Sequence, residues 1–176
     1  MSATDSELIA RVLVSNDHHA FAELVRLHQS AVRGMLRKLT NGDFATADDY
    51  AQETFLKAYQ KMSTFRNESA FSTWLYRIAY NIWRDSRRRI TEVVGIDEEA
   101  AARIAAPVEM ESGLKQDLTA AMDRLSEPER SSILMCYQSG MTHEEASDVL
   151  RMPIGTIKTH IARGKEKLRA FLQNSH

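Results

Sequence analysis

Apolar residues recur at steps of three and four along most of the chain, the spacing that gives an α-helix one continuous apolar face. Thr4 and Glu7 form a capping-box pair, which predicts a first helix ending near Val14, before Asn16-Asp17. A longer helix follows and ends at Asn41-Gly42. The apolar face of this longer helix consists of Phe21, Leu24, Val25, Val32, Met35, Leu36 and Leu39.

A third amphipathic pattern begins near Thr46–Asp49. Its predicted inner face consists of Ala51, Phe55, Ala58, Tyr59 and Met62. Its predicted outer face consists of Asp48, Asp49, Gln52, Glu53 and Lys57. The following segment, residues 65–71 (FRNESAF), is short, polar and edged by aromatic residues, so we expect a loop held at both ends by buried rings.

The next predicted helix, residues 73–89, combines arginines with aromatic residues. If Leu75, Ile78, Ala79 and Ile82 face inward, then Arg77, Tyr80, Arg84 and Arg88 face outward, with Tyr76 and Asn81 on the flanks. Rings beside cations suit single-stranded nucleic acid, because bases stack on the rings while cations follow the backbone. The alternative is that the aromatic residues belong to the core. We expect this for Trp74, whereas both interpretations remain open for Tyr76 and Tyr80.

Residues 91–113 lack a sustained apolar period and contain Gly95, Pro107 and Gly113, which predicts a flexible linker. Helical patterns resume at 114–125, at 127–139, at 142–150 and at 154–173. We therefore expect an all-α protein of two small helical domains, residues 1–90 and 114–176, joined by this linker.

Charge is segregated along the chain, although the formal net charge is only −1. Residues 73–89 carry five arginines against one aspartate, a net charge of +4. Residues 151–169 carry six basic residues against one glutamate, a net charge of +5. Between them, residues 91–113 carry six acidic residues against one arginine, a net charge of −5. Two basic helices flanking an acidic linker favour a nucleic-acid-binding function.

The sequence offers little for metal, cofactor or catalytic chemistry. One cysteine, Cys136, allows no internal disulfide and no paired-thiolate zinc site, and we expect it to be a buried structural thiol. The histidines are scattered, and no nucleophile–base pair or phosphate-binding glycine loop is present, so we expect no metal, no cofactor and no enzyme activity. No signal peptide and no apolar stretch of about 20 residues is present, which predicts a cytoplasmic protein without membrane insertion.

The C-terminal pattern has helix-turn-helix spacing. Thr142 and Glu145 form a second capping-box pair, a turn surrounds Arg151-Met152-Pro153, and a basic helix follows. Side chains near the start of such a helix read base edges in the major groove, and later cations contact phosphates. The alternative is a solvated basic helix packed on its neighbour, but the capped helix, the turn and the Pro-Ile-Gly start together favour DNA binding.

Four motifs resemble those of the extracytoplasmic-function group of bacterial sigma factors. Residues 49–55 (DYAQETF) are similar to the D-L-x-Q-E-x-F signature of sigma region 2, with Tyr50 in place of the usual leucine. Residues 74–88 resemble the W-L-x-x-I-A-x-N-x-x-x-D-x-x-R pattern of the same region. Residues 155–159 (GTIKT) resemble the recognition helix of region 4, and residues 125–130 (LSEPER) resemble the entry to that domain with its proline displaced by two positions.

The resemblance implies partners and candidate site residues. Region 2 binds the clamp of the largest subunit of core RNA polymerase, which implicates Asp49, Gln52 and Glu53. Contact with the minus-ten promoter element, including a pocket for a flipped base, implicates Phe65, Arg66, Asn67, Ser69, Phe71, Tyr76, Arg77, Tyr80, Asn81, Arg84 and Arg88. Region 4 binds the polymerase flap and the minus-thirty-five element, which implicates Arg151, Pro153, Gly155, Thr156, Lys158, Thr159, His160 and Arg163. The usual inhibitor in this family is an anti-sigma factor, often membrane-anchored.

An alternative function is a stand-alone helix-turn-helix regulator, because residues 157–161 (IKTHI) also resemble the recognition helices of response regulators. This alternative leaves the pattern of residues 46–89 unexplained. A regulator would bind duplex DNA without polymerase, which distinguishes it from a sigma factor.

Overall fold

The computed structural model describes residues 4–95, 118 and 120–174, and the described part is helical with no β-strand. The N-terminal helices are α1 (Asp5–Ser15), α2 (His18–Leu39), α3 (Phe44–Gln60) and α4 (Phe71–Val94), with a short 3₁₀ turn, η1 (Met62–Thr64), after α3. The C-terminal elements are α7 (Glu127–Ile133), η2 (Leu134–Gln138), α8 (His143–Leu150) and α9 (Ile154–Asn174). The all-α prediction is therefore confirmed, and no helix in the described ranges is long and apolar enough to cross a membrane.

Local side-chain chemistry sets the helix starts. Both predicted capping boxes form, at Thr4 with Glu7 and at Thr142 with Glu145. Helix α3 begins at Phe44, slightly before the predicted start, because the Asp43 carboxylate accepts a hydrogen bond from the Thr46 amide at 3.1 Å.

Two other elements differ from the prediction. Helix α4 is longer than the expected 73–89 and passes the expected boundary at residue 90, ending where Gly95 adopts a φ of 66°. The segment predicted as one helix at 127–139 is an α-helix only to Ile133, after which η2 is a π-helix. Most of the predicted linker lies outside the described residues, as do residues 114–117 and 119 of the predicted helix at 114–125, whereas residues 118 and 120–122 are helical.

The N-terminal helices form a bundle around an apolar core. Helix α2 packs against α1, α3 and α4, and Leu8, Leu24, Leu36 and Leu75 are each at most 1% exposed. In the C-terminal part, α9 packs against α7 and α8 around Val149 and Ile157. At Gly164, α9 approaches α7 so closely that an added Cβ would lie 2.6 Å from the Ile133 Cδ1 atom.

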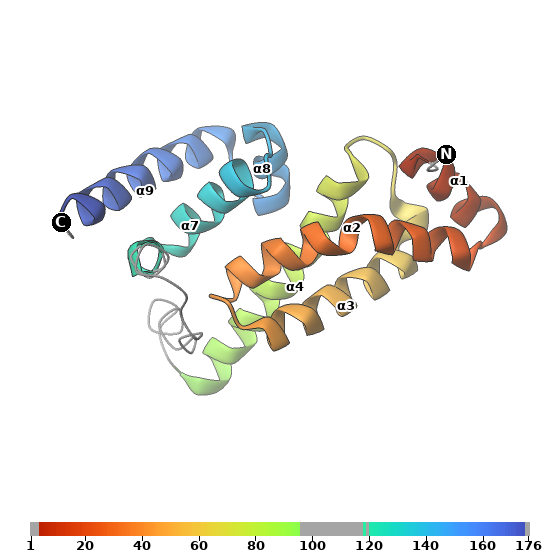
Figure 1. Ribbon diagram of the computed structural model, residues 1–176, viewed down its shortest axis with the longest axis horizontal. Coiled ribbons are helices and arrows are strands. Elements are labelled where there is room, and N and C mark those ends of the chain that lie inside the picture. The colour runs from red at the N-terminus through yellow and green to blue at the C-terminus, as the bar shows by residue number, and fades with distance from the viewer. Residues whose placement is uncertain (1–3, 96–117, 119, 175–176) are drawn as a thin grey trace.

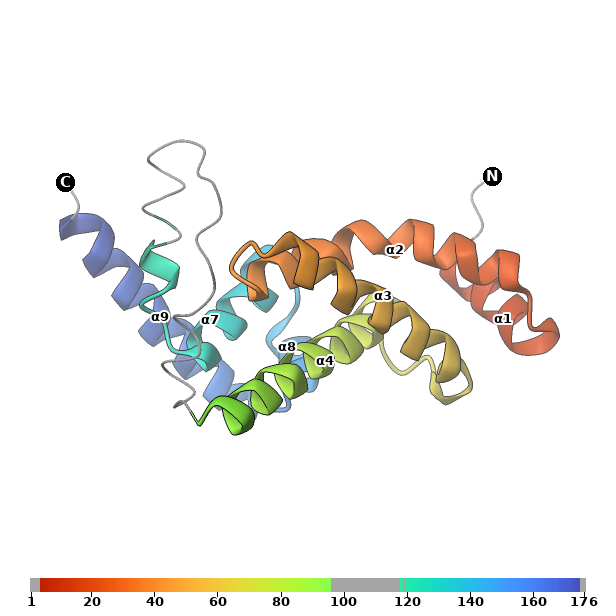
Figure 2. The ribbon, with the colours of Figure 1, turned by 90° about the horizontal axis from the view of Figure 1, so that it is seen from below.

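The C-terminal helices lie directly on the N-terminal bundle. Helix α8 packs against α4, and η2 contacts α2. Figure 1 shows α7 and α8 beside the end of the bundle formed by α2 and α4, with α1 at the opposite end. Figure 2, seen from below, shows the same arrangement and places α9 on the outer side of the C-terminal helices.

Candidate nucleic-acid interface

Three aromatic rings hold the loop between η1 and α4. The Phe65 and Phe71 rings meet edge to face with centroids 5.4 Å apart, and the Trp74 ring lies 5.3 Å from Phe65 and 5.6 Å from Phe71. Both phenylalanines are buried, as the sequence predicted for the ends of this loop. Between them, Arg66 and Asn67 are exposed and Ser69 is half-buried. The cluster therefore holds a polar loop against the bundle from both ends.

A pocket of about 240 Å³ lies between this loop and α1. Its lining consists of Ser6, Ile9, Ala10 and Leu13 of α1 with Phe65, Arg66 and Asn67 of the loop. The walls are mostly apolar, with polar groups contributed by the loop and by Ser6. This composition suits a flat ring with polar edges.

Sequence reasoning missed the α1 side of the pocket. The available signal was Leu13, which continues the apolar face of α1 although it is 47% exposed. Conversely, Asn81 does not belong to the pocket lining. It follows Phe71 by ten helical residues, about 15 Å along the axis of α4.

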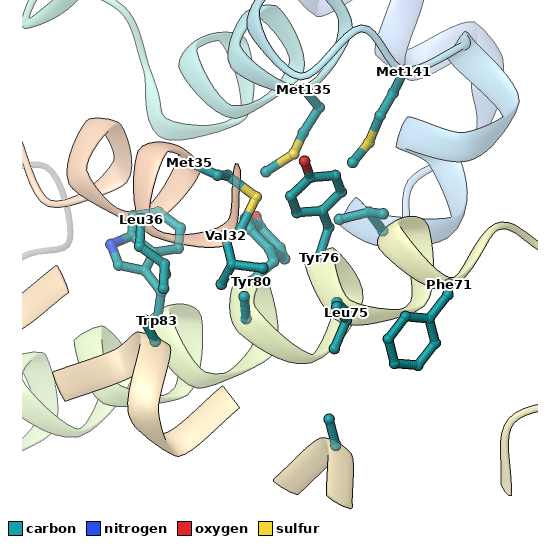
Figure 3. Packing of buried hydrophobic residues seen from close by; sticks show 14 of the residues in the cluster. Val32, Met35, Leu36, Phe71, Leu75, Tyr76, Tyr80, Trp83, Met135 and Met141 are labelled. Carbon is teal, nitrogen blue, oxygen red and sulfur yellow. The ribbon is translucent and has the colours of Figure 1, made fainter. Parts of the chain in front are cut away.

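Tyr76 and Tyr80 are buried, at 9% and 4% exposure, so the prediction that Tyr80 faces outward is wrong for this arrangement. The cause is the C-terminal part of the chain, which covers this face of α4 with Met135 and Met141 (Figure 3). Burial, together with the nearby charge of Glu127, raises the pKa of Tyr80 to about 12.

Arg77, Arg84 and Arg88 of α4 each lie beside a carboxylate. Arg77 lies 3.2 Å from Asp148 of α8, Arg84 lies 3.3 Å from the adjacent Asp85, and Arg88 lies 3.0 Å from Glu92 one turn further on. The Arg88 side chain is 77% exposed and the Arg84 side chain 38% exposed, so both can exchange their carboxylates for phosphates. Arg77, in contrast, is held by the other part of the chain.

The C-terminal helices form the predicted helix-turn-helix. Helix α8 ends at Arg151 in the left-handed conformation, with φ of 54°. The Ser147 hydroxyl then donates to the Met152 carbonyl at 2.5 Å, which fixes the turn before α9. These local bonds define the angle at which α9 leaves α8.

Helix α9 buries one face and leaves the opposite face in solvent. Ile157 and Ile161 are buried against α7 and α8. The predicted DNA-reading residues lie on the other side, where Thr156 and His160 are half-buried and Arg151, Pro153, Gly155, Lys158, Thr159 and Arg163 are exposed. The Thr159 hydroxyl donates to the Gly155 carbonyl at 2.9 Å, which orients this side chain along the helix.

The outer face of α3 carries the residues predicted to contact polymerase. Asp49, Gln52 and Glu53 are all exposed, and Glu53 pairs with Lys57 at 2.7 Å. The sequence prediction did not include Leu56, which is 59% exposed on the same stripe, three residues after Glu53. An apolar side chain among charged ones at the surface is typical of a protein interface.

No group of three or more histidine, cysteine, aspartate or glutamate side chains in the described part of the chain could hold a metal ion. Cys136 is half-buried and unpaired, and burial raises the pKa of its thiol, which disfavours the reactive thiolate.

A helix-turn-helix with an exposed basic face, joined to a bundle that carries an arginine-rich helix, is typical of a DNA-binding protein. Comparisons with known proteins agree with this class. Residues 24–92 match the sigma-70 region 2 family, and residues 115–168 match the sigma-70 region 4 family.

Relatives match over nearly the whole chain. The chain is 32% identical to the RNA polymerase sigma-H factor of Pseudomonas aeruginosa, covering 96% of this chain and 94% of the relative. The sigma factor RpoE in complex with the anti-sigma factor NepR from Bartonella quintana is similar in structure, with a TM-score of 0.73, 27% identity, and coverage of 87% and 96%. CnrH in complex with the cytosolic domain of CnrY is also similar, with a TM-score of 0.71, 26% identity, and coverage of 98% and 99%.

The chain therefore belongs to the sigma-70 family, in its extracytoplasmic-function group. It is an alternative sigma factor, the class of protein that binds core RNA polymerase and directs transcription initiation at specific promoters.

Proposed function

We propose that this sigma factor acts in the cytoplasm by binding DNA and polymerase, without catalysing a reaction itself. We further propose that three separate surfaces carry out promoter recognition and polymerase binding. The observation that carries the proposal is helix α9, which buries Ile157 and Ile161 and exposes Lys158, Thr159 and Arg163. A basic face at the start of a helix-turn-helix recognition helix fits the major groove of DNA. We assign this face to the minus-thirty-five element.

The second surface is the pocket between α1 and the loop at residues 65–67, which we assign to a base flipped out of the minus-ten element. Flipping costs a few kcal/mol of stacking, so the pocket must offer stacking and hydrogen bonds in return. Phe65 and Leu13 supply apolar walls, and Arg66 and Asn67 supply polar groups at the rim. Arg84 and Arg88 of α4 would contact the adjacent phosphates.

The third surface is the exposed stripe of α3, which we assign to the clamp of the polymerase largest subunit. Asp49, Gln52 and Glu53 offer polar contacts suited to a reversible complex, and Leu56 offers the apolar contact that polar residues alone lack.

Control by an anti-sigma factor is proposed by similarity. RpoE, which this chain resembles in structure, is in complex with the anti-sigma factor NepR, and CnrH, which it also resembles, is in complex with the cytosolic domain of CnrY. We expect a corresponding inhibitor for this chain, membrane-anchored if it follows the common pattern of the family.

Run-off transcription with core polymerase and genomic promoter fragments tests these assignments. The wild-type chain should initiate at specific sites, and Lys158→Ala should reduce initiation about tenfold by removing a major-groove or phosphate contact. Arg169→Ala, an equal charge change near the far end of α9, is the matched control. Binding of duplex DNA without any effect on initiation would instead favour a stand-alone regulator.

The pocket is tested by Asn67→Gly in separate measurements of promoter melting and of duplex binding with core polymerase, because glycine tolerates the left-handed backbone of this residue, with φ of 58°, while removing its side chain. We expect weaker promoter melting with unchanged binding of duplex minus-thirty-five DNA. Glu68→Ala, in the same exposed loop, is the control. If Asn67→Gly and Glu68→Ala melt the promoter equally well, the pocket does not bind the flipped base.

A further inference from the structure

His28 occupies a position of α2 at which the helical pattern favours an apolar side chain. Leu24 and Val32, one turn before and one turn after it, are each 1% exposed. His28 therefore lies on the stripe of α2 that faces the core, and its own side chain is only 16% exposed. Burying a polar group without a hydrogen-bond partner costs free energy, so the imidazole at this position needs one.

The hydrogen-bond partner of His28 belongs to α1. The Nε2 atom of His28 lies 2.9 Å from the Oδ2 atom of Asp5, which is the first residue of that helix. A carboxylate in the first turn of a helix is favoured by the helix dipole. With a hydrogen on Nε2, the imidazole donates to this carboxylate whether or not the ring is charged. The contact therefore ties the start of α1 to the middle of α2.

The same ring contacts the start of α4. The His28 and Phe71 rings meet edge to face, with centroids 5.3 Å apart and planes at 73°. Phe71 is 4% exposed and is the first residue of α4. Aromatic pairs in this geometry contribute beyond the area that they bury. His28 therefore extends the cluster of Phe65, Phe71 and Trp74 by one ring and joins this cluster to α2.

These two contacts lead to the two walls of the pocket. Asp5 adjoins Ser6, and Ser6 lines the pocket on the α1 side. The Phe71 ring packs edge to face on the Phe65 ring, with centroids 5.4 Å apart, and Phe65 lines the pocket on the loop side. The side chain of His28 therefore contacts one neighbour of each wall.

The spacing between these walls decides how well a flat ligand fits. Carbon atoms in contact lie about 3.5–4.0 Å apart, and a gap of about 0.5–1 Å loses roughly a quarter to a half of the dispersion energy. A base between Leu13 and Phe65 therefore gains stacking only while both walls stay at contact distance. Helix α1 packs on α2 through apolar side chains, and such packing is not directional. A directional hydrogen bond fixes the position of α1 more closely.

We propose that His28 is a positioning residue of the minus-ten pocket, because it holds Asp5 of α1 and Phe71 of α4 together and so sets the distance between the two walls. His28 does not belong to the pocket lining, so it acts through these two neighbours. The proposal rests on the proposed function of the pocket, since the base to be received defines the useful spacing. The alternative is that His28 only fills space in the core, as any ring of similar size would.

Two substitutions at position 28 separate these alternatives, because each keeps one of the two contacts. His28→Phe keeps a ring against Phe71 but cannot donate a hydrogen bond to Asp5, whereas His28→Gln keeps a donor but has no ring. If His28 links the two walls, both variants should lose the fixed spacing. A space-filling role predicts instead that His28→Phe behaves like the wild type. Asp5→Ala, at a side chain that is 39% exposed, should fold and reproduce the effect of His28→Phe.

Electron paramagnetic resonance on the full chain measures the spacing directly. Nitroxide labels are placed on α1 and on the loop through Arg11→Cys and Glu68→Cys, at exposed residues outside the pocket lining. Cys136→Ser removes the one cysteine of the sequence, so that only these two positions react. The labelled chain with His28 should give a narrow distance distribution, and both position-28 variants should give a broader one. Promoter melting with core polymerase should fall about three- to tenfold in both, as the loss of one hydrogen bond predicts.

Tyr59→Phe is the matched control, because it removes one hydrogen bond at the other end of α1, from the Tyr59 hydroxyl to Asn16 at 2.7 Å. It should leave the distance distribution and promoter melting unchanged. The proposal is overturned if His28→Phe keeps the narrow distribution, or if Tyr59→Phe broadens it as much. The distance measurement involves neither promoter nor polymerase. Broad distributions with normal melting would therefore overturn the assignment of the pocket to a flipped base, while supporting the role of His28 in spacing the walls.

Discussion

Tyr80 makes the free energy of unfolding depend on pH in the alkaline range. Its hydroxyl is buried near Glu127, which raises its pKa in the folded state from 10.0 to about 12. A raised pKa means that the folded state favours the protonated phenol. This contribution is fully present below pH 10 and is lost as the pH rises through the folded-state value.

We therefore expect the wild type to lose about 2 kcal/mol more stability between pH 10 and 12 than Tyr80→Phe, which keeps the ring but cannot ionise. Chemical denaturation at a series of pH values measures this difference. Tyr59→Phe, which removes a half-buried tyrosine hydroxyl that donates to Asn16, controls for the loss of a tyrosine hydroxyl in general. Parallel pH profiles for wild type and Tyr80→Phe would contradict the burial of the hydroxyl.

Among single residues, Tyr76 and Tyr80 show what the sequence could and could not establish. Periodicity identified the helix and left both residues at the boundary between core and outer face. It could not identify what covers them, because the covering residues Met135 and Met141 are more than fifty positions away along the chain. The same limit explains why the α1 side of the pocket was missed.

At the scale of elements, the link between α7 and α9 depends on Glu129. Its carboxylate accepts hydrogen bonds from the Ser126 amide at 2.9 Å and from Lys167 at 2.8 Å. Burial alone would raise the pKa of Glu129, but these hydrogen bonds outweigh burial and lower it below its ordinary value of 4.5. A lowered pKa stabilises the fold above pH 4.5, and this stabilisation is lost as the pH falls through the folded-state value.

Glu129→Gln should lower the free energy of unfolding by about 1–2 kcal/mol at neutral pH, because the amide keeps the shape but loses the charge. The variant should also lose less stability than the wild type on acidification. Denaturation monitored by circular dichroism at pH 7 and pH 3.5 checks both effects, with the exposed Glu166→Gln as control. An unchanged acid profile would show that the ion pair does not stabilise the α7–α9 contact.

Elements defined by local signals could be predicted well. Capping residues act within one turn, so the starts of α1 and α8 followed from Thr4 and Thr142. The π-helical turn η2 could not be predicted, because no local motif distinguishes residues 134–138 from an ordinary helical pattern. Its wide turn coincides with the packing of Met135 between two parts of the chain.

At the scale of the whole molecule, the outer face of α3 stays exposed while α4 is covered. We therefore expect core polymerase to reach this face in the arrangement that the structure shows. Leu56→Glu should weaken binding to core polymerase about tenfold, ~1.4 kcal/mol, because it places a charge at the apolar contact. Val14→Glu, which changes an even more exposed apolar residue of α1, should leave affinity unchanged. A fluorescence-anisotropy titration measures both affinities. If Leu56→Glu and Val14→Glu weaken binding equally, the exposed stripe of α3 is not the polymerase contact.

The basic face of α9 is exposed even when α4 is covered, and residues 151–169 carry a net charge of +5. Such a face attracts any duplex through its phosphates, whatever the base sequence. In the complex with core polymerase, this attraction would let the enzyme slide along duplex DNA instead of dissociating between encounters. The search for a promoter would then proceed along DNA that is already bound nonspecifically. Because the attraction is electrostatic, the speed of this search would depend on the ionic strength of the cell.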